Sequence, residues 1–147
     1  MIKNTNSYGL LIFRVSLGVV LLAHSFYLKF FIYTLSGTAG YFESIGLPSW
    51  MAYVVFITEV AAGVLIILGF QTRMFSALVV PILTGATWAH WSNGWLFTYE
   101  NGGWEYPLFL AFMAVSLVLT GPGKFALDNR KIEQHTSVHE TGMLTNQ

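Results

Sequence analysis

The sequence contains no cysteine. This absence excludes disulfide bonds, thiolate nucleophiles, CxxC redox pairs, covalently attached c-type haem and iron–sulfur clusters held by cysteine alone. A redox function would therefore require a bound cofactor that histidine, carboxylate or aromatic side chains hold.

Charged side chains are also scarce, because Asp, Glu, Lys and Arg make up only 10% of the 147 residues while 54% are hydrophobic. Soluble domains carry about 25% charged residues, so this deficit predicts a membrane protein. The formal net charge is zero, which gives no indication of a nucleic-acid partner. The first apolar run is too long for a cleavable signal peptide and Arg14 interrupts its start, so we expect it to remain as a helix.

Four long apolar segments follow one another along the chain. The segment at 50–70 has one charged residue, Glu59, near its middle. At about 1.5 Å per residue, a helix of this length crosses the ~30 Å hydrocarbon core of a bilayer. Pro107 is expected in the first turn of the last helix, where proline is well tolerated. The sequence predicts an all-α, integral-membrane four-helix bundle with helices at about 8–33, 50–70, 74–91 and 104–120.

The distribution of basic residues predicts the orientation of these helices. With four crossings, both termini lie on one side, and that side collects Lys3, Arg73, Lys124, Arg130 and Lys131, whereas the opposite loops contain Lys29 alone. Because positive residues remain in the cytoplasm, both termini are expected there. An aromatic belt at the outer boundary would consist of Trp50, Trp91, Trp95 and Trp104. We expect one membrane domain at 1–123 and a polar cytoplasmic tail at 124–147.

Two charged side chains are expected at depth in the bilayer. Arg14 would lie about 9 Å and Glu59 about 16 Å from the cytoplasmic side, an offset that an arginine side chain can span. The sequence therefore predicts an Arg14–Glu59 ion pair, with Lys29 extending to the lipid headgroups. A carboxylate at this depth is costly and marks a functional candidate, although it could instead serve only to tie helices together.

A second polar layer, near the outer face, would contain His24, His90 and Glu105. These residues could form a metal site with an open position, and His24 with His90 could ligate a haem iron. Each also has a simpler explanation, because membrane histidines often form hydrogen bonds between helices and Glu105 could be a solvated loop carboxylate. In the tail, His135 and His139 could bind a metal if that segment were helical, whereas a disordered tail is favoured.

The order of several short motifs resembles that of the DoxX family of small bacterial four-helix membrane proteins. The motifs are LIFRVSLG at 11–18, His24 with Lys29, FESIGLP at 42–48, TEVAAG at 58–63, LG at 68–69 with TR at 72–73, HWSNG at 90–94, GGWEYP at 102–107 and GPG at 121–123. Ser25 stands where the family often has glycine. The resemblance implies a multi-pass protein of the bacterial inner membrane. It also implies a likeness to the membrane subunit of thiosulfate:quinone oxidoreductases and to membrane oxidoreductase complexes that handle oxidative stress.

Two interpretations from different classes remain open. In the first, the protein is a redox-linked subunit that binds quinone and receives electrons from an oxidoreductase partner, with the chain itself an enzyme or only part of one. Proton transfer would then involve Glu59, His24, His90 and Glu105, and cofactor contacts would involve His24, His90, Glu105, Trp104 and Arg14. In the second, it is a non-enzymatic scaffold or a small-solute transport module. A homo-oligomer is compatible with either interpretation, since so small a bundle has little internal volume for a site.

Overall fold

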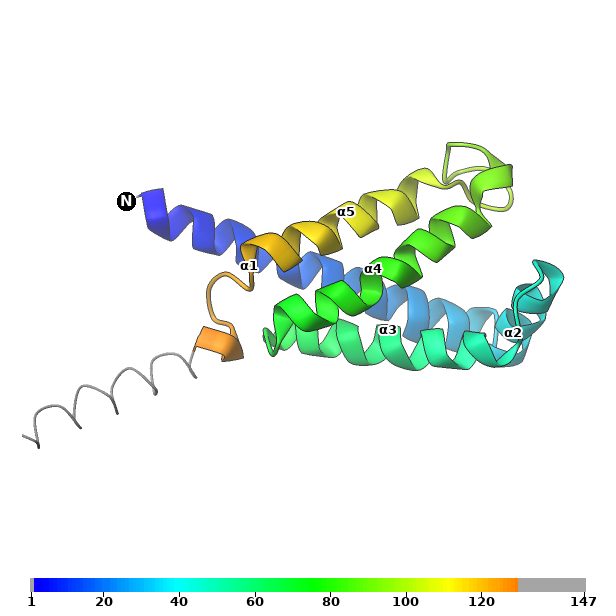
Figure 1. Ribbon diagram of the computed structural model, residues 1–147, viewed down its shortest axis with the longest axis horizontal. Coiled ribbons are helices and arrows are strands. Elements are labelled where there is room, and N and C mark those ends of the chain that lie inside the picture. The colour runs from blue at the N-terminus through cyan, green and yellow to red at the C-terminus, as the bar shows by residue number, and fades with distance from the viewer. Residues whose placement is uncertain (1, 130–147) are drawn as a thin grey trace, which may run out of the picture.

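The computed structural model describes residues 2–129, and within that range every regular element is helical (Figure 1). This confirms the predicted all-α class for the described part of the chain. The elements are α1 (Ile2–Leu22), η1 (Ala23–Ile32), α2 (Leu35–Ser44), α3 (Trp50–Leu68), α4 (Thr72–Ala89), η2 (Trp91–Asn93) and α5 (Glu105–Thr120).

The first long helix changes its winding partway along. α1 continues directly into η1, which is a π-helix. A π-helix forms i→i+5 hydrogen bonds, so it takes more residues per turn than the 3.6 of an α-helix. Among residues 2–129, two helical stretches are long and apolar enough to cross a membrane, namely Thr5–Ile32 and Trp50–Leu68, and Glu105–Thr120 is a shorter apolar helix.

The long helices pack as two pairs, α1 with α3 and α4 with α5, which meet along α3 and α4 (Figure 1). Near the N-terminal half of α1 the elements lie close together, and we call this the packed end. Toward η1 and α2, the pair formed by α4 and α5 diverges from α3 (Figure 1). We call this second end, which holds α2 and the segment at 90–104, the open end.

A continuous apolar core joins the two pairs. It is formed by Leu17, Leu21, Ala62, Ile66, Val79, Leu83, Leu110, Ala111, Ala114 and Leu117. Between α1 and α3 the backbones approach closely, since a Cβ on Gly18 would lie 2.8 Å from the carbonyl oxygen of Gly63. Small residues permit such close approach between membrane helices, where van der Waals packing drives association.

Helix α2 lies in a segment for which the sequence predicted only a loop. The Thr34 hydroxyl accepts a hydrogen bond from the Gly37 backbone N–H at 3.1 Å, so Thr34 acts as the N-cap of α2. Threonine is a favoured N-cap residue because its side-chain oxygen satisfies an otherwise unpaired amide of the first turn. The predicted position of Pro107 in the first turn of α5 is confirmed.

The segment at 121–129 folds back onto the packed end. The Asp128 carboxylate accepts hydrogen bonds from the backbone N–H groups of Gln71 (2.7 Å) and Thr72 (3.0 Å), at the start of α4. The backbone N–H of Lys124 donates to the carbonyl of Ser7 at 3.0 Å. Residues 124–129, assigned from the sequence to a polar tail, therefore belong to the packed structure. The rest of that tail, including His135 and His139, lies outside the described residues.

Replacing Asp128 by Ala is expected to destabilise the packed end. The change removes both acceptors from the first turn of α4, and loss of an N-cap acceptor costs about 1 kcal/mol. Thermal unfolding in detergent, followed by circular dichroism, measures the effect. Asp128→Asn keeps one acceptor oxygen and should lose less stability than Asp128→Ala. Equal losses in the two variants would show that the hydrogen bonds to α4 are not the cause.

Candidate functional site

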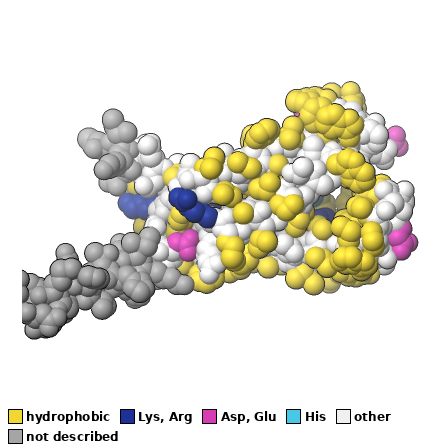
Figure 2. All heavy atoms as spheres, in the orientation of Figure 1, with side chains coloured by type: hydrophobic (Ala, Val, Ile, Leu, Met, Phe, Trp, Pro, Cys, Tyr) yellow, Lys and Arg dark blue, Asp and Glu magenta, His cyan; other side chains and the backbone are white. Residues whose placement is uncertain are grey.

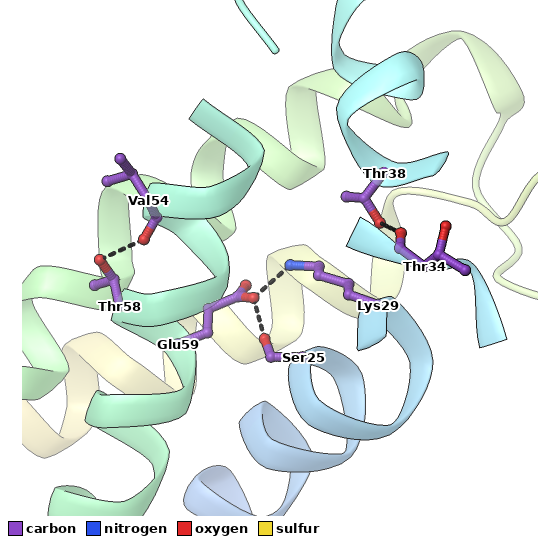
Figure 3. A network of polar contacts seen from close by, with 7 residues as sticks. All are labelled: Ser25, Lys29, Thr34, Thr38, Val54, Thr58 and Glu59. Carbon is purple, nitrogen blue, oxygen red and sulfur yellow. Dashed lines mark hydrogen bonds and ion pairs between the residues drawn. The ribbon is translucent and has the colours of Figure 1, made fainter. Parts of the chain in front are cut away.

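The Glu59 carboxylate is the centre of the polar network at the open end (Figure 3). Glu59 lies on α3 and is only 5% exposed. Its Oε2 atom accepts hydrogen bonds from the Ser25 hydroxyl and from the Lys29 ammonium, both on η1. Figure 3 shows these two side chains pointing from η1 toward Glu59. The network therefore joins η1 to α3 through an ion pair between the half-buried Lys29 and the buried Glu59.

The partner of Glu59 differs from the one predicted. The sequence analysis paired Glu59 with Arg14 and directed Lys29 to the headgroups, and both interpretations are wrong, because Lys29 forms the ion pair. Arg14 does not reach Glu59 because it lies at the packed end, beside Gly69 and Lys124. For Lys29 the physical reason is the winding of η1. The prediction assumed 3.6 residues per turn throughout, whereas the wider turns of the π-helix redirect every side chain after Leu22.

Arg14 lies instead at the packed end. Its side chain is 1% exposed, and Nη2 donates to the Lys124 carbonyl at 3.4 Å. A Cβ on Gly69 would overlap Nη1, and the Asp128 carboxylate attracts the guanidinium. Arg14 thus connects α1 to the segment that follows α5. The sequence analysis had placed Arg14 with His24 and His90 in one cofactor site, whereas the structure places Arg14 at the other end of the bundle.

His24 lies among four elements and is nevertheless exposed. Its ring, on η1, is 5.8 Å from the ring of Tyr106 on α5, measured between centroids. The charges of Lys29 and Glu59 act on the imidazole, and so does His90 on α4. His24 therefore lies where η1 faces the α4–α5 pair, with part of its side chain accessible. Figure 2 shows a hollow at the open end, with a basic side chain inside it.

His90 ends α4 and faces the same region. Its Nδ1 lies 2.9 Å from the carbonyl oxygen of Ala86, and its ring is 6.4 Å from that of Tyr41 on α2. A carbonyl can only accept, so Nδ1 carries the proton in this hydrogen bond. In a neutral imidazole, Nε2 is then an acceptor. His90 can therefore accept a proton or a hydrogen bond from a ligand.

Glu105 and Trp104 organise the segment at 90–104. The Glu105 carboxylate accepts a hydrogen bond from the Phe97 backbone N–H at 3.1 Å, and its own N–H donates to the Trp95 carbonyl at 3.2 Å. The Trp104 ring stacks on Trp91 at 4.7 Å and meets Trp95 edge-on at 4.5 Å. These contacts fit the simpler interpretation, in which Glu105 is a loop carboxylate.

The metal site considered as one alternative for His24, His90 and Glu105 is not assembled. Within residues 2–129, no group of three or more His, Cys, Asp or Glu side chains could hold a metal ion. The reason is that the carboxylate of Glu105 is directed to the backbone of its own loop rather than to the histidines.

Sequence analysis missed the site roles of Ser25, Lys29, Tyr41 and Tyr106. A signal was present for the first two, since Ser25 and Lys29 are four residues apart and therefore share a face of a helix. No comparable local signal identifies Tyr41 or Tyr106, because their neighbours come from distant parts of the chain.

Comparison with known proteins places the sequence in a family. A family model described as DoxX matches residues 9–91, a range that contains Ser25, Lys29, Glu59 and His90 and ends before Glu105. The chain belongs to the DoxX family. The predicted resemblance is thereby confirmed, and the ion-pair network lies within the matched region.

Three relatives of this DoxX protein are informative. "Putative oxidoreductase CatD" of Bacillus subtilis (strain 168) is 35% identical over 125 residues, which cover 82% of the chain and 84% of CatD. Inner membrane protein YqjF of Escherichia coli (strain K12) is 29% identical over 63% of the chain and 71% of its own length. Inner membrane protein YphA of the same organism is 33% identical over 64% of the chain and 71% of its own length. No solved structure matches the chain.

Family membership and the two candidate spans together identify the chain as a helical membrane protein. Ring and aliphatic side chains that are exposed on the helices are therefore expected to face lipid. They include Val54 and Ile57 on α3 and Phe109 and Phe112 on α5.

Proposed function

We propose that this DoxX-family protein is a quinone-interacting subunit of an oxidoreductase system in the bacterial inner membrane. In this proposal α1 with η1, α3, α4 and α5 each cross the bilayer, with both termini in the cytoplasm. The observation that supports it most strongly is the hollow at the open end, where the exposed His24 lies beside the ion pair between the half-buried Lys29 and the buried Glu59 (Figure 2). The name of the relative CatD is in keeping with an oxidoreductase role.

The residues of the hollow match the chemistry of a quinone headgroup. A quinone presents a flat ring with two carbonyl oxygens, and ligand sites combine aromatic surfaces with a few placed polar groups. Tyr106 offers a ring face beside His24, and Lys29 and His24 can donate to a carbonyl oxygen. His90 offers an acceptor suited to the hydroxyl group of the reduced form.

The reaction that this site would support consumes two electrons and two protons for each quinone reduced to quinol. The electrons would come from a reduced oxidoreductase partner, because the chain contains no nicotinamide or flavin fingerprint. The protons would pass through His24 and the Lys29–Glu59 pair, groups that can exchange them when a ligand is held nearby. Ser25, which donates to Glu59, would fix the orientation of the carboxylate.

Replacing His24 by Ala is expected to weaken quinone binding by at least about tenfold, since an interaction worth about 1.4 kcal/mol corresponds to that factor. The protein would be purified in mild detergent and titrated with decylubiquinone, with tryptophan fluorescence as the signal. Glu105→Gln serves as the comparison, because Glu105 holds its own loop and should leave the affinity within about threefold. Equal affinities for His24→Ala and the unmodified protein would remove His24 from the site.

A second function is favoured by one observation, namely that the Glu59 carboxylate is already paired with both Ser25 and Lys29. A pair of this kind can serve only to fix how two helices are aligned, as in a scaffold. Exchanging the charges in the double variant Lys29→Glu/Glu59→Lys distinguishes the two functions. A scaffold should keep its partner proteins in co-purification, whereas the quinone site should lose at least about tenfold in affinity. Retained affinity in the exchanged variant would favour the scaffold.

A further inference from the structure

The buried faces of α1 and α4 share the same order of polar and apolar residues, and α3 adds an apolar stretch at the same level. On the first helix, Arg14 is followed by Leu17 and Leu21 and then by Ser25. Eleven residues separate the two polar positions, which corresponds to about 16 Å of helix. The polar groups at the open end are thus separated from Arg14 at the packed end by a layer that contains apolar side chains.

Helix α4 repeats this separation at similar length, and α3 contributes apolar residues to the same layer. On α4, the buried Thr72 and Ser76 come first, then Val79 and Leu83, then Thr87. The Thr87 hydroxyl donates to the Leu83 carbonyl, so its proton is already engaged within the helix. On α3, the buried Ala62, Gly63 and Ile66 follow Glu59 toward the packed end.

The apolar layer is tightly closed. Leu17, Ala62, Ile66, Val79, Ala114 and Leu117 are each 0% exposed. The close approach of Gly18 and Gly63 brings the backbones of α1 and α3 together within the same layer. Protein interiors packed in this way contain few voids larger than a water molecule, and an apolar layer offers no partners to hold one.

We infer that the Lys29–Glu59 site exchanges protons only with the aqueous phase beyond the open end, and that residues 2–129 form no proton path through the membrane. The inference about access follows from packing alone. Its consequence for turnover depends on the proposed quinone function: each quinone reduced would take two protons from the phase at the open end, and each quinol oxidised would release two protons there. With both termini in the cytoplasm, that phase is the outer one.

The cysteine-free sequence permits a direct test by single cysteine substitutions. His24→Cys reports on the hollow, Ser36→Cys on the exposed surface of α2, Gln71→Cys on the exposed turn at the packed end, and Ala114→Cys on the apolar layer. Each variant is treated with a membrane-impermeant methanethiosulfonate, first in intact cells and then in inverted membrane vesicles.

The expected result is that His24→Cys reacts only in the preparation in which Ser36→Cys reacts, and Gln71→Cys only in the other. Ala114→Cys should react in neither preparation and only after denaturation in SDS. Reaction of His24→Cys from the side of Gln71→Cys, from both sides or from neither side would overturn the inference. If His24→Cys does not insert, Tyr106→Cys, across the hollow on α5, carries the same expectation.

A second measurement addresses passage through the membrane. The protein is reconstituted into liposomes that contain the pH dye pyranine, and a proton gradient is applied with valinomycin and potassium to balance charge. Proton entry should equal that of protein-free liposomes, and faster entry would overturn the inference. Quinone titration of the same samples tests the proposed function separately from the inference about proton access. If the protein binds no quinone but its cysteine variants are labelled from one side only, the proposed function is refuted and the inference stands.

Discussion

Replacing Glu59 by Gln should cause strong losses in both stability and quinone affinity. The variant leaves the Lys29 ammonium half-buried beside η1 without its counter-charge. Breaking a buried pair by removing one partner costs about 3–5 kcal/mol, because the remaining charge is uncompensated. Lys29 retains some exposure, so the lower part of that range is expected. Thermal unfolding in detergent and decylubiquinone titration measure the two losses.

Two further variants serve as controls for Glu59→Gln. Glu43→Gln makes the same change at an exposed position on α2 and should alter stability by no more than about 0.5 kcal/mol. The double variant Lys29→Met/Glu59→Gln removes both charges and should regain most of the stability, because replacing a buried pair by neutral groups is often tolerated. Quinone affinity should stay low in the double variant. Full recovery of affinity would show that the ion pair has only a structural role.

Replacing Gly69 by Ala should cause the second strong loss, this time at the packed end. Gly69 ends α3 with φ at +69°, a conformation that costs about 1–2 kcal/mol for a residue with a Cβ. The added methyl group would also overlap Arg14 Nη1 and the Cβ of Ala126, and forcing extra atoms into a packed region costs about 1–3 kcal/mol more. Thermal unfolding should show the sum of the two costs.

Gly46 provides a matched control for this substitution. It has a similar positive φ of +84°, yet a Cβ at this position would meet nothing within 4 Å. Gly46→Ala should therefore show the conformational cost alone, and the difference between the two variants isolates the overlap with Arg14 and Ala126. Equal losses would mean that Arg14 and the segment at 121–129 move aside without cost.

The sequence predicted best what depends on local pattern. The apolar run that contains Glu59 became α3, and Pro107 lies in the first turn of α5 as proline preferences require. The unusual charge of Glu59 within that run also identified the residue at the centre of the polar network. These predictions succeeded because helix length, hydrophobicity and one charged residue within an apolar segment can be read from the sequence, without knowing which residues contact each other in the fold.

The sequence could not predict the features set by contacts between distant segments. The pairing of Glu59 with Lys29 depends on the π-helical winding of η1, and the four-residue spacing of Ser25 and Lys29 indicates only that the two share a helix face. The role of Glu105 depends on where the backbone of Phe97 lies, eight residues away in an irregular loop. Asp128 had the appearance of a tail residue because its two partners at the start of α4 are more than fifty residues earlier in the chain.

The position of Asp128 has a consequence for biogenesis. During synthesis, α1 and α4 leave the ribosome well before residues 124–129, so the carboxylate that completes the start of α4 arrives last. Until then, Arg14 lacks both the Lys124 carbonyl and the attraction of Asp128. A chain cut short after residue 123 would therefore leave the guanidinium of Arg14 without either of these partners.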